Sequence, residues 1–221
     1  MNNDKHYHVV FATPGPNMHR EYVKSLVATC SWLSERGKSF TLLNRNASFV
    51  SNAREWTAVG GEGSEWGIQE IGMGKFTYDR LVWIDSDISW EVSAFEKLIS
   101  NDLDIVSGVM PVNLDGRIGA TRFNEDGIPN VMDWKSLMFE DEVTEVDGVS
   151  FGFLAVKSGV FENMKRPWFR LREVPVLGHE GLLTTLGEDY SWCLGAKEAG
   201  YRIWIDQRVR VSHHKEYALE V

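Results

Sequence analysis

The stretch LVWIDSDISW, residues 81–90, places two aspartates, Asp85 and Asp87, directly after a run of apolar residues. A short apolar run of this kind is typical of a strand that is buried in a sheet. An Asp-x-Asp after a strand is often only a turn in which the side chains bond to the backbone. Two carboxylates this close also repel each other unless a cation lies between them. The rest of the sequence must therefore decide between a turn and a metal site.

Strand-like and helix-like segments alternate around this stretch. Short apolar runs bounded by turn residues predict strands, and apolar residues spaced three or four apart predict helices. The strands are expected at 7–15, 38–46, 76–85 and 104–111, and the helices at 20–36, from 51 or 52 to about 60, and at 91–102. This alternation is typical of an α/β fold with a parallel sheet and helices on its faces. Ligands of such sheets bind at the carboxyl ends of the strands, where Asp85 and Asp87 fall.

The second half of the chain, after Pro111, has a different pattern but no linker before it. Residues 116–129 predict a β-hairpin with its turn at 125–127, and residues 150–158 predict a further strand. A helix is then expected at 187–200 and a strand at 202–214. We therefore expect one domain that spans residues 1–221. Its fold class is α/β, with a mostly parallel, Rossmann-like central sheet, helices on both faces and an added β-hairpin.

Composition excludes several classes of partner and site. The formal net charge is -9 and the pI is about 5.2, so a nucleic-acid backbone or an anionic membrane would be repelled. The two cysteines, Cys30 and Cys193, have no partner at zinc-site spacing, so neither a disulfide framework nor structural zinc is expected. No apolar stretch approaches the roughly 18 residues of a membrane-spanning helix. These features predict a cytoplasmic protein with no integral membrane segment.

Two further motifs lie near the end of the chain. In GEDYSW, Glu188 and Asp189 would occupy the first turn of a helix, where carboxylates also serve simply as favourable partners of the helix dipole. In RVRVSHHK, His213 follows a strand of alternating valines, 24 residues after Asp189. An isolated histidine is usually a surface or hydrogen-bonded core residue. The neighbouring His214 is the natural candidate for that ordinary role.

Taken together, the three motifs resemble nucleotide-sugar-dependent glycosyltransferases of the A-type (GT-A) fold. The resemblance covers nearly the whole chain and is densest at 81–110 and 187–214. The segments that carry it are 12–14, 51–54, 83–90, 104–108, 152–164, 187–206 and 211–214. It implies that residues 1–110 form the nucleotide-binding half. Residues 111–221 would then form the acceptor side, with the Glu-Asp helix and a metal-binding C-terminal strand.

The resemblance also implies a set of residues that bind the sugar donor. The loop after the first strand should hold the base and ribose, and the segment at 51–54 should reach the base or the diphosphate. The implied residues are Thr13, Pro14, Asn52, Arg54, Asp85, Ser86, Gly152 and Phe153. Uridine is the commonest base in this family, so a UDP-sugar is the favoured nucleoside diphosphate sugar.

The metal site and the catalytic residues follow from the same resemblance. Mn²⁺ or Mg²⁺ would be held by Asp87 and His213, with Asp85 as a weaker ligand that also contacts ribose or sugar. Glu188 would contact the donor sugar. Asp189 would be the base that deprotonates the acceptor hydroxyl in an inverting reaction, which we favour over retention. The expected activity is transfer of a hexose-type sugar to a hydroxyl of a glycan or other acceptor.

Other functions fit the sequence less well. A phosphohydrolase of the haloacid-dehalogenase type carries its Asp-x-Asp on the first strand, whereas here it follows the third and precedes Ile88 and Ser89. Sugar nucleotidyltransferases open with a glycine-rich signature that is missing here. A non-catalytic module that binds a nucleotide sugar or glycan is the main alternative. The compact single domain resembles virus- and bacterium-encoded members, which would place a viral protein in the host cytoplasm.

Two expectations concern ligand coverage. The small and polar residues at 176–187 predict a loop that closes over the bound donor. Trp90, Trp134 and Trp168 are candidates for stacking on sugar rings, although most of the nine tryptophans must lie in the core.

Overall fold

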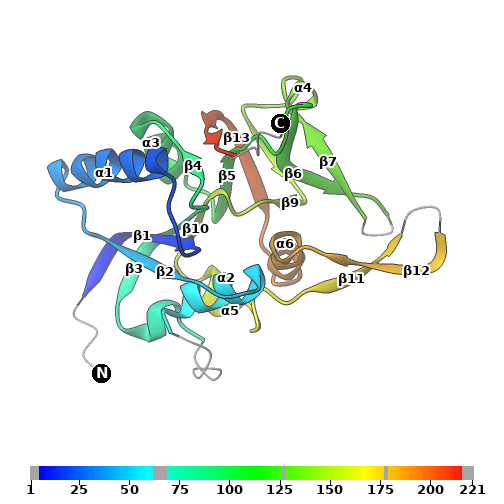
Figure 1. Ribbon diagram of the computed structural model, residues 1–221, viewed down its shortest axis with the longest axis horizontal. Helices are drawn as coiled ribbons and strands as arrows, with labels where there is room; N and C mark the ends of the chain where they lie inside the picture. Colours follow the sequence, from blue (N-terminus) through cyan, green and yellow to red (C-terminus); the bar gives the residue numbers. More distant parts are fainter. Residues whose placement is uncertain (1–4, 62–68, 126–127, 177–178, 216–221) are drawn as a thin grey trace, which may run out of the picture.

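The computed structural model describes residues 5–61, 69–125, 128–176 and 179–215. Its centre is a seven-stranded sheet with the order β2-β1-β3-β10-β5-β13-β8 (Figure 1). The strands are β1 His6–Pro14, β2 Phe40–Arg45, β3 Thr77–Ile84, β5 Ile105–Val109, β8 Val143–Val146, β10 Phe153–Lys157 and β13 Ile203–Arg210. β1 pairs in parallel with β2 and β3, and β5 with β13, while β10 and β8 run antiparallel to their neighbours. The sheet is thus mostly parallel, as predicted.

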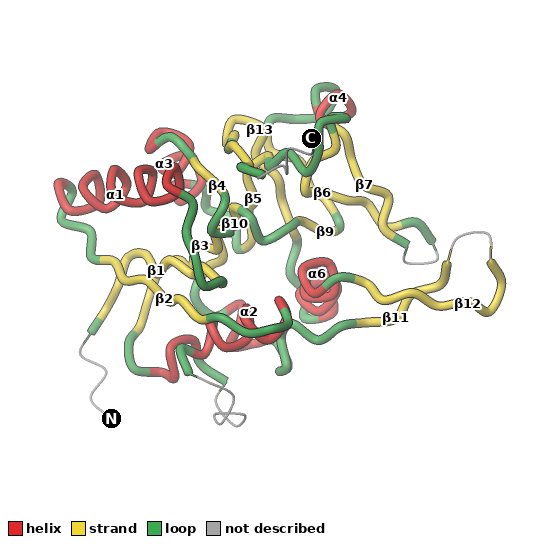
Figure 2. Tube along the Cα trace, in the orientation of Figure 1, coloured by secondary structure: helices red, strands yellow, loops and turns green. Residues whose placement is uncertain are grey.

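Helices cover both faces of this sheet. One face carries α1 and α3, and the opposite face carries α2, α5 and α6 (Figures 1 and 2). Their bounds are α1 Arg20–Glu35, α2 Val50–Val59, α3 Val92–Ser100, α5 Val160–Asn163 and α6 Glu188–Glu198. Along β1, Val9 and Phe11 pack in the core under α1 and α3, whereas Val10 and Ala12 pack in the core on the other face. Successive strand side chains point to opposite faces, so one apolar run supplies both cores.

The second half of the chain joins the sheet of the first half. β10 lies inside the sheet, between β3 and β5, rather than at its edge. Gly152 precedes this strand, and a Cβ on it would lie 2.0 Å from Sδ of Met110. The close approach of these two segments therefore depends on a glycine at this position. Strands from both halves therefore share one sheet.

Smaller sheets extend the core. β6 Arg117–Phe123 and β7 Pro129–Asp133 form the predicted hairpin, while 126–127 of its expected turn lie outside the described residues. β6 also pairs with β9 Gly148–Val149. The short helix α4 Trp134–Leu137 follows β7, and the 3₁₀ turn η1 Ile71–Gly74 precedes β3. Among the described residues, no helix combines the length and apolar character that crossing a membrane requires.

The segment before α6 forms strands and not the loop that the sequence predicts. β11 Arg172–Val176 and β12 His179–Leu186 pair in an antiparallel hairpin that projects from the body of the protein (Figure 1). The expectation of a closing loop at 176–187 is therefore wrong for this structure. The two threonines in the run Leu183-Thr-Thr-Leu186 indicate a strand, because β-branched residues favour a pleated conformation.

Candidate functional site

The Asp-x-Asp turn lies at the carboxyl end of β3, beside the segment that carries His213. The short strand β4 Ile88–Ser89 leaves this turn and pairs with β14 Ser212–His213, so Ile88 lies opposite His213. The backbone N–H of His214 donates to the carbonyl oxygen of Asp87 at 2.8 Å. These contacts bring two motifs that are 126 positions apart in the sequence to one edge of the sheet.

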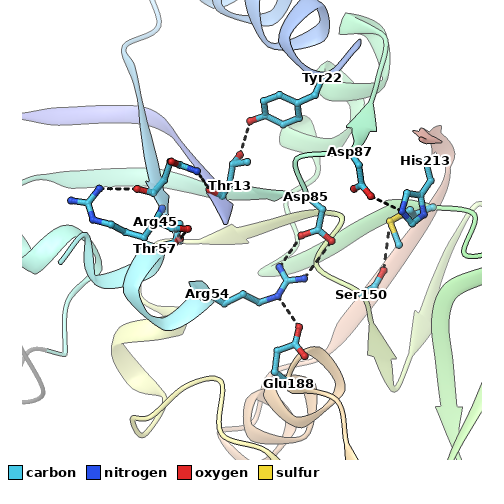
Figure 3. Close-up of polar contacts among 12 residues, drawn as sticks. Thr13, Tyr22, Arg45, Arg54, Thr57, Asp85, Asp87, Ser150, Glu188 and His213 are labelled. Carbon is cyan, nitrogen blue, oxygen red and sulfur yellow. Dashed lines mark hydrogen bonds and ion pairs between the residues drawn. The ribbon is translucent and has the colours of Figure 1, made fainter. Parts of the chain in front are cut away.

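Asp87 and His213 face each other directly. Oδ2 of Asp87 lies 3.1 Å from Nε2 of His213 (Figure 3). Nδ1 of His213 lies 2.9 Å from the carbonyl oxygen of Pro111, which can only accept a hydrogen bond, so Nδ1 carries a proton. The hydrogen bond to Asp87 raises the pKa of His213. Burial opposes ionisation of Asp87, but the bond to His213, the charge of that ring and smaller contributions together outweigh burial and lower the pKa of the carboxyl.

This pair fits a divalent cation. A histidine that donates Nδ1–H to a carbonyl presents Nε2 as a ligand, and the bond to Pro111 is the kind of outer contact that fixes ring orientation in metal sites. A carboxylate oxygen and an imidazole nitrogen together suit Mn²⁺. Among the described residues, no group of three or more His, Cys, Asp or Glu side chains is placed to hold a metal. The other ligands would therefore come from water and from the substrate.

Arg54 joins the two acidic motifs. Nε of Arg54 donates to Oε1 of Glu188 at 2.9 Å, and its Nη2 donates to Oδ2 of Asp85 at 3.3 Å (Figure 3). Nη1 lies 3.1 Å from Oδ1 of Asp85 but has no hydrogen bond of good geometry. We take the 3.1 Å contact as an ion pair that leaves an N–H of Nη1 with unused capacity. Both oxygens of Asp85 thus face Arg54, and this carboxylate does not join Asp87 and His213.

Arg54 is almost fully buried, with 5% of its side chain exposed. Burial opposes its charge, but the carboxylates around it outweigh that effect and hold the pKa of the guanidinium above its ordinary value. Its guanidinium carbon also lies 5.1 Å from the centre of the Phe151 ring. One cation thus serves a cluster of three acidic residues, namely Asp85, Glu188 and Asp189.

Asp189 is the acid of this cluster that lacks a direct bond to Arg54. It lies in the first turn of α6, and its Oδ1 accepts the backbone N–H of Tyr190 at 2.8 Å. Burial, reinforced by the charge of Glu188, raises the pKa of Asp189 to about 6. A carboxylate with that pKa is ionised at neutral pH and is a stronger base than an ordinary aspartate, as general-base catalysis requires.

A cleft of about 410 Å³ is lined by Arg54, Asp85, Asp87 and His213, whereas the predicted catalytic residues Glu188 and Asp189 do not line it. Its walls come from the turns that follow β1, β2 and β3 and from the start of α2. The residues that line it are Pro14, Gly15, Asn46, Ala47, Ser48, Val50, Ala53, Arg54, Asp85, Ser86, Asp87 and His213. Of the predicted site residues, the structure therefore brings Pro14, Arg54, Asp85, Ser86, Asp87 and His213 to one cleft.

Four predicted donor-binding residues do not line this cleft. Thr13 is fully buried, and its Oγ1 bonds to the hydroxyl of Tyr22 at 2.5 Å, so its side chain supports the strand end rather than contacting a ligand. Phe153 is also fully buried, and Gly152 packs against Met110. Asn52 is exposed on α2 but outside the cleft walls. Sequence pattern placed these residues near the correct turns but did not indicate where their side chains point.

The turn between β2 and α2 was missed as part of the site. Asn46, Ala47 and Ser48 line the cleft, and they follow the carboxyl end of a parallel strand, which is the available sequence signal. Asn44 was missed as well. Its amide donates to the carbonyl oxygens of Thr13 at 2.7 Å and Gly15 at 2.9 Å, and so fixes the wall formed by the turn after β1.

Two of the three candidate tryptophans belong to the core. Trp90 is 6% exposed and donates Nε1–H to Thr29 at 2.8 Å, and Trp168 is 2% exposed and donates to Phe161. The expectation that these two stack on sugars is therefore wrong. Trp134 is 43% exposed and remains available.

Comparison with known proteins identifies the fold. No protein-family model matches the sequence, and no curated protein matches it. The structure is similar to A197 from STIV, with 20% identity and a TM-score of 0.56 over 95% of this chain and 86% of that one. It is also similar to the catalytic domain of Drosophila β1,4-galactosyltransferase 7, solved with xylobiose, with 12% identity and a TM-score of 0.50 over 95% and 71% of the chains. The chain has a GT-A-like fold.

At these identities the comparisons establish the GT-A-like fold and no activity. Function must be argued from the site that this chain builds on it. In this GT-A-like sheet, the carboxyl ends of β1, β2 and β3 carry the cleft, and the start of α6 supplies the acids beside it. The turn after β3 thus contacts both the C-terminal histidine and, through Arg54, the helix that carries Asp189.

Proposed function

We propose that the protein is a metal-dependent glycosyltransferase that moves a hexose-type sugar from a nucleoside diphosphate sugar to a hydroxyl group of an acceptor. The observation that carries this proposal is the approach of Asp87 to His213 at the edge of the cleft. A UDP-sugar is the favoured donor, because uridine is the commonest base in the family that the sequence resembles. The cleft extends from Asp87 and His213 along the turns after β1 and β2, and this extension would accommodate the nucleoside.

The donor side uses Asp87, His213 and Arg54. Asp87 and His213 would hold Mn²⁺ or Mg²⁺ against the diphosphate. When bound, this cation would act as a Lewis acid that neutralises the charge developing on the leaving diphosphate. Arg54 adds a second positive centre at the wall of the cleft. An acidic protein needs such local cations to bind an anionic ligand.

The acceptor side uses Asp189. In the transfer step, the acceptor oxygen forms a bond to the anomeric carbon while the bond from that carbon to the diphosphate oxygen breaks. The acceptor hydroxyl proton passes to the carboxylate of Asp189, and the electron pair of the broken bond stays with the diphosphate. This assignment corresponds to inversion at the anomeric carbon. Glu188, held by Arg54, would fix the start of α6 beside the donor sugar.

A thermal-shift screen tests the proposed function. Nucleoside diphosphates and their sugars are added with Mn²⁺ or with EDTA, and the melting temperature is compared with that of the free protein. A donor at about 100 times its Kd should stabilise the protein by about 2.7 kcal/mol. We expect this stabilisation for uridine compounds only when the metal is present. Equal shifts with Mn²⁺ and EDTA, or no shift with any nucleotide, would refute the proposal.

Replacement of His213 tests the metal site more locally. His213→Ala should weaken Mn²⁺ binding in the presence of UDP by at least about tenfold, because one of two protein ligands is lost. His214→Ala is the matched control. His214 stacks on His19 with 4.4 Å between ring centres, and its Nε2 lies 2.7 Å from Oγ of Ser89, so it faces away from the Asp87 pair. Calorimetric titration with Mn²⁺ should separate the two variants, and equal losses in both would contradict the assignment.

A further inference from the structure

A second cavity, of about 210 Å³, is lined in part by Pro111, whose carbonyl oxygen contacts His213. It is formed where α4 packs over the ends of β5, β6 and β13. The residues that line it are Val109, Pro111, Gly116, Ile118, Trp134, Leu137, Met138, Gln207, Arg210 and Val211. This volume is below the roughly 300–1,000 Å³ of pockets for drug-sized ligands, so it suits a single ring.

Trp134 gives this cavity an exposed aromatic wall. Trp134 is the first residue of α4 and is 43% exposed, whereas Leu137 and Ile118, which also line the cavity, are each 2% exposed. The indole lies against Gly116, since a Cβ on that glycine would be 3.2 Å from Cδ1 of Trp134. Gly116 has a φ of +94°, which glycine adopts readily. A glycine at this turn thus makes room for an indole that is not fully buried.

The edge of the cavity carries polar groups with unused hydrogen-bonding capacity. Gln207 donates its amide N–H groups to the carbonyl oxygens of Leu137 and Asp141, which fixes the side chain, and no described residue donates to its Oε1. Nε of Arg210 donates to the carbonyl oxygen of Gln207 at 3.2 Å, and no acceptor within the described part of the chain takes its Nη groups. Nε1 of Trp134 likewise has no acceptor there. The cavity is therefore apolar on its floor and polar at its edge.

The cavity neighbours the donor cleft through shared residues. A third hollow has His213 in common with the cleft and Pro111 in common with the Trp134 cavity. The carbonyl oxygen of Pro111 lies 2.9 Å from Nδ1 of His213, so the same residue contacts the predicted metal-site histidine and lines the Trp134 cavity.

We propose that the Trp134 cavity binds one sugar ring of a glycan, as a remote subsite for a glycan acceptor. Its role for the acceptor rests on the proposed glycosyltransferase function, whereas sugar binding itself does not. An aromatic face packs against the C–H face of a sugar, and directed donors and acceptors at the edge bind its hydroxyls. A lipid chain is a poorer candidate for the cavity, because it has no polar groups to bond with Oε1 of Gln207 or the Nη groups of Arg210. A phosphate group would pair with Arg210, but its oxygens would have no proton to donate to Oε1 of Gln207.

A glycan microarray with hexoses, N-acetylhexosamines, pentoses and uronic acids tests this inference without nucleotide or metal. The native chain should bind at least one of these classes. Trp134→Ala should lower that signal about tenfold, which is the scale expected for loss of an aromatic contact. Phe139→Ala is the control, because Phe139 is 91% exposed nearby but does not line the cavity. It should bind as the native chain does.

A second readout does not depend on the fold of the variant. In native protein labelled with ¹⁵N at tryptophan, the indole signal of Trp134 should shift when the glycan selected on the array is added, while the buried Trp90 signal should not. No binding on the array, or binding that leaves Trp134 unshifted, would overturn the inference. Because neither experiment uses UDP or Mn²⁺, this failure is distinct from failure of the donor thermal shift.

Discussion

Asp189→Asn should greatly slow sugar transfer and, at the same time, make the fold more stable at neutral pH. Loss of the general base is expected to lower the rate by about 10²–10⁴-fold, with donor binding retained. Burial and the charge of Glu188 raise the pKa of Asp189 from an ordinary 3.8 to about 6, so its ionisation opposes folding. Removing that charge should increase the free energy of unfolding by about 2–3 kcal/mol.

The pH dependence gives this prediction a definite sign. A carboxyl whose pKa is raised on folding favours the folded state most below pH 4, and that contribution is lost as the pH rises through about 6. The gain in Asp189→Asn should therefore be absent near pH 4 and complete at pH 8. Urea unfolding at the two pH values measures it. Asp147→Asn should show the opposite sign at pH 8, because the bond to Lys197 and the Phe123 N–H outweigh burial and lower the pKa of Asp147.

Two results would contradict this account of Asp189. Full transfer activity in Asp189→Asn would mean that the residue is only part of the helix terminus. An equal change in stability at pH 4 and pH 8 would mean that its charge does not oppose folding.

Arg54→Met should be the most destabilising single change at the site. Removal of one partner of a buried ion pair typically costs about 3–5 kcal/mol, since the remaining charges stay buried without compensation. The acids that lose a bonded partner are Asp85, whose side chain is 28% exposed, and Glu188, whose side chain is 12% exposed. Asp189 loses a nearby opposite charge as well. The surface pair Arg202–Glu145 supplies the control, with side chains 66% and 42% exposed. Arg202→Met should cost less than about 1 kcal/mol.

A compensating variant separates charge from packing. In Arg54→Met combined with Asp85→Asn and Glu188→Gln, the two acids bonded to Arg54 lose their charge and Asp189 is the one acid of the cluster that keeps it. Most of the lost stability should therefore return. Donor binding should not return, because the cation beside the cleft is still missing. If the triple variant is no more stable than Arg54→Met, packing of the guanidinium against Phe151 would be its main role.

Much of the fold was predictable from local pattern. The apolar run before Asp85 forms β3, and the spacing of Tyr22 and Leu33 gives the buried face of α1. The helix ends near Gly37, which has a φ of +65°. The position of β10 inside the sheet was not predictable, because an apolar strand carries no record of which neighbours it pairs with. Its pairing is set by tertiary packing, including the contact of Gly152 with Met110.

The site was predictable only in part, and mainly through resemblance. Arg54 and Glu188 are 134 positions apart, and no local pattern could show that one guanidinium joins them. Thr13 illustrates the opposite error. The position of a threonine at a strand end suggests that its hydroxyl can contact a ligand. Here Oγ1 of Thr13 is buried and hydrogen-bonded to the hydroxyl of Tyr22. Side-chain direction depends on partners from other elements.

The most direct test of the central claim is detection of a histidine nitrogen bound to Mn²⁺. In protein labelled with ¹⁵N-histidine and mixed with UDP and Mn²⁺, pulsed electron paramagnetic resonance should show a ¹⁵N coupling. The coupling should persist in His214→Ala and disappear in His213→Ala, and Asp87→Ala should bind little Mn²⁺. Bound Mn²⁺ without a histidine coupling in the native protein, or undiminished binding in Asp87→Ala, would contradict the proposed metal site.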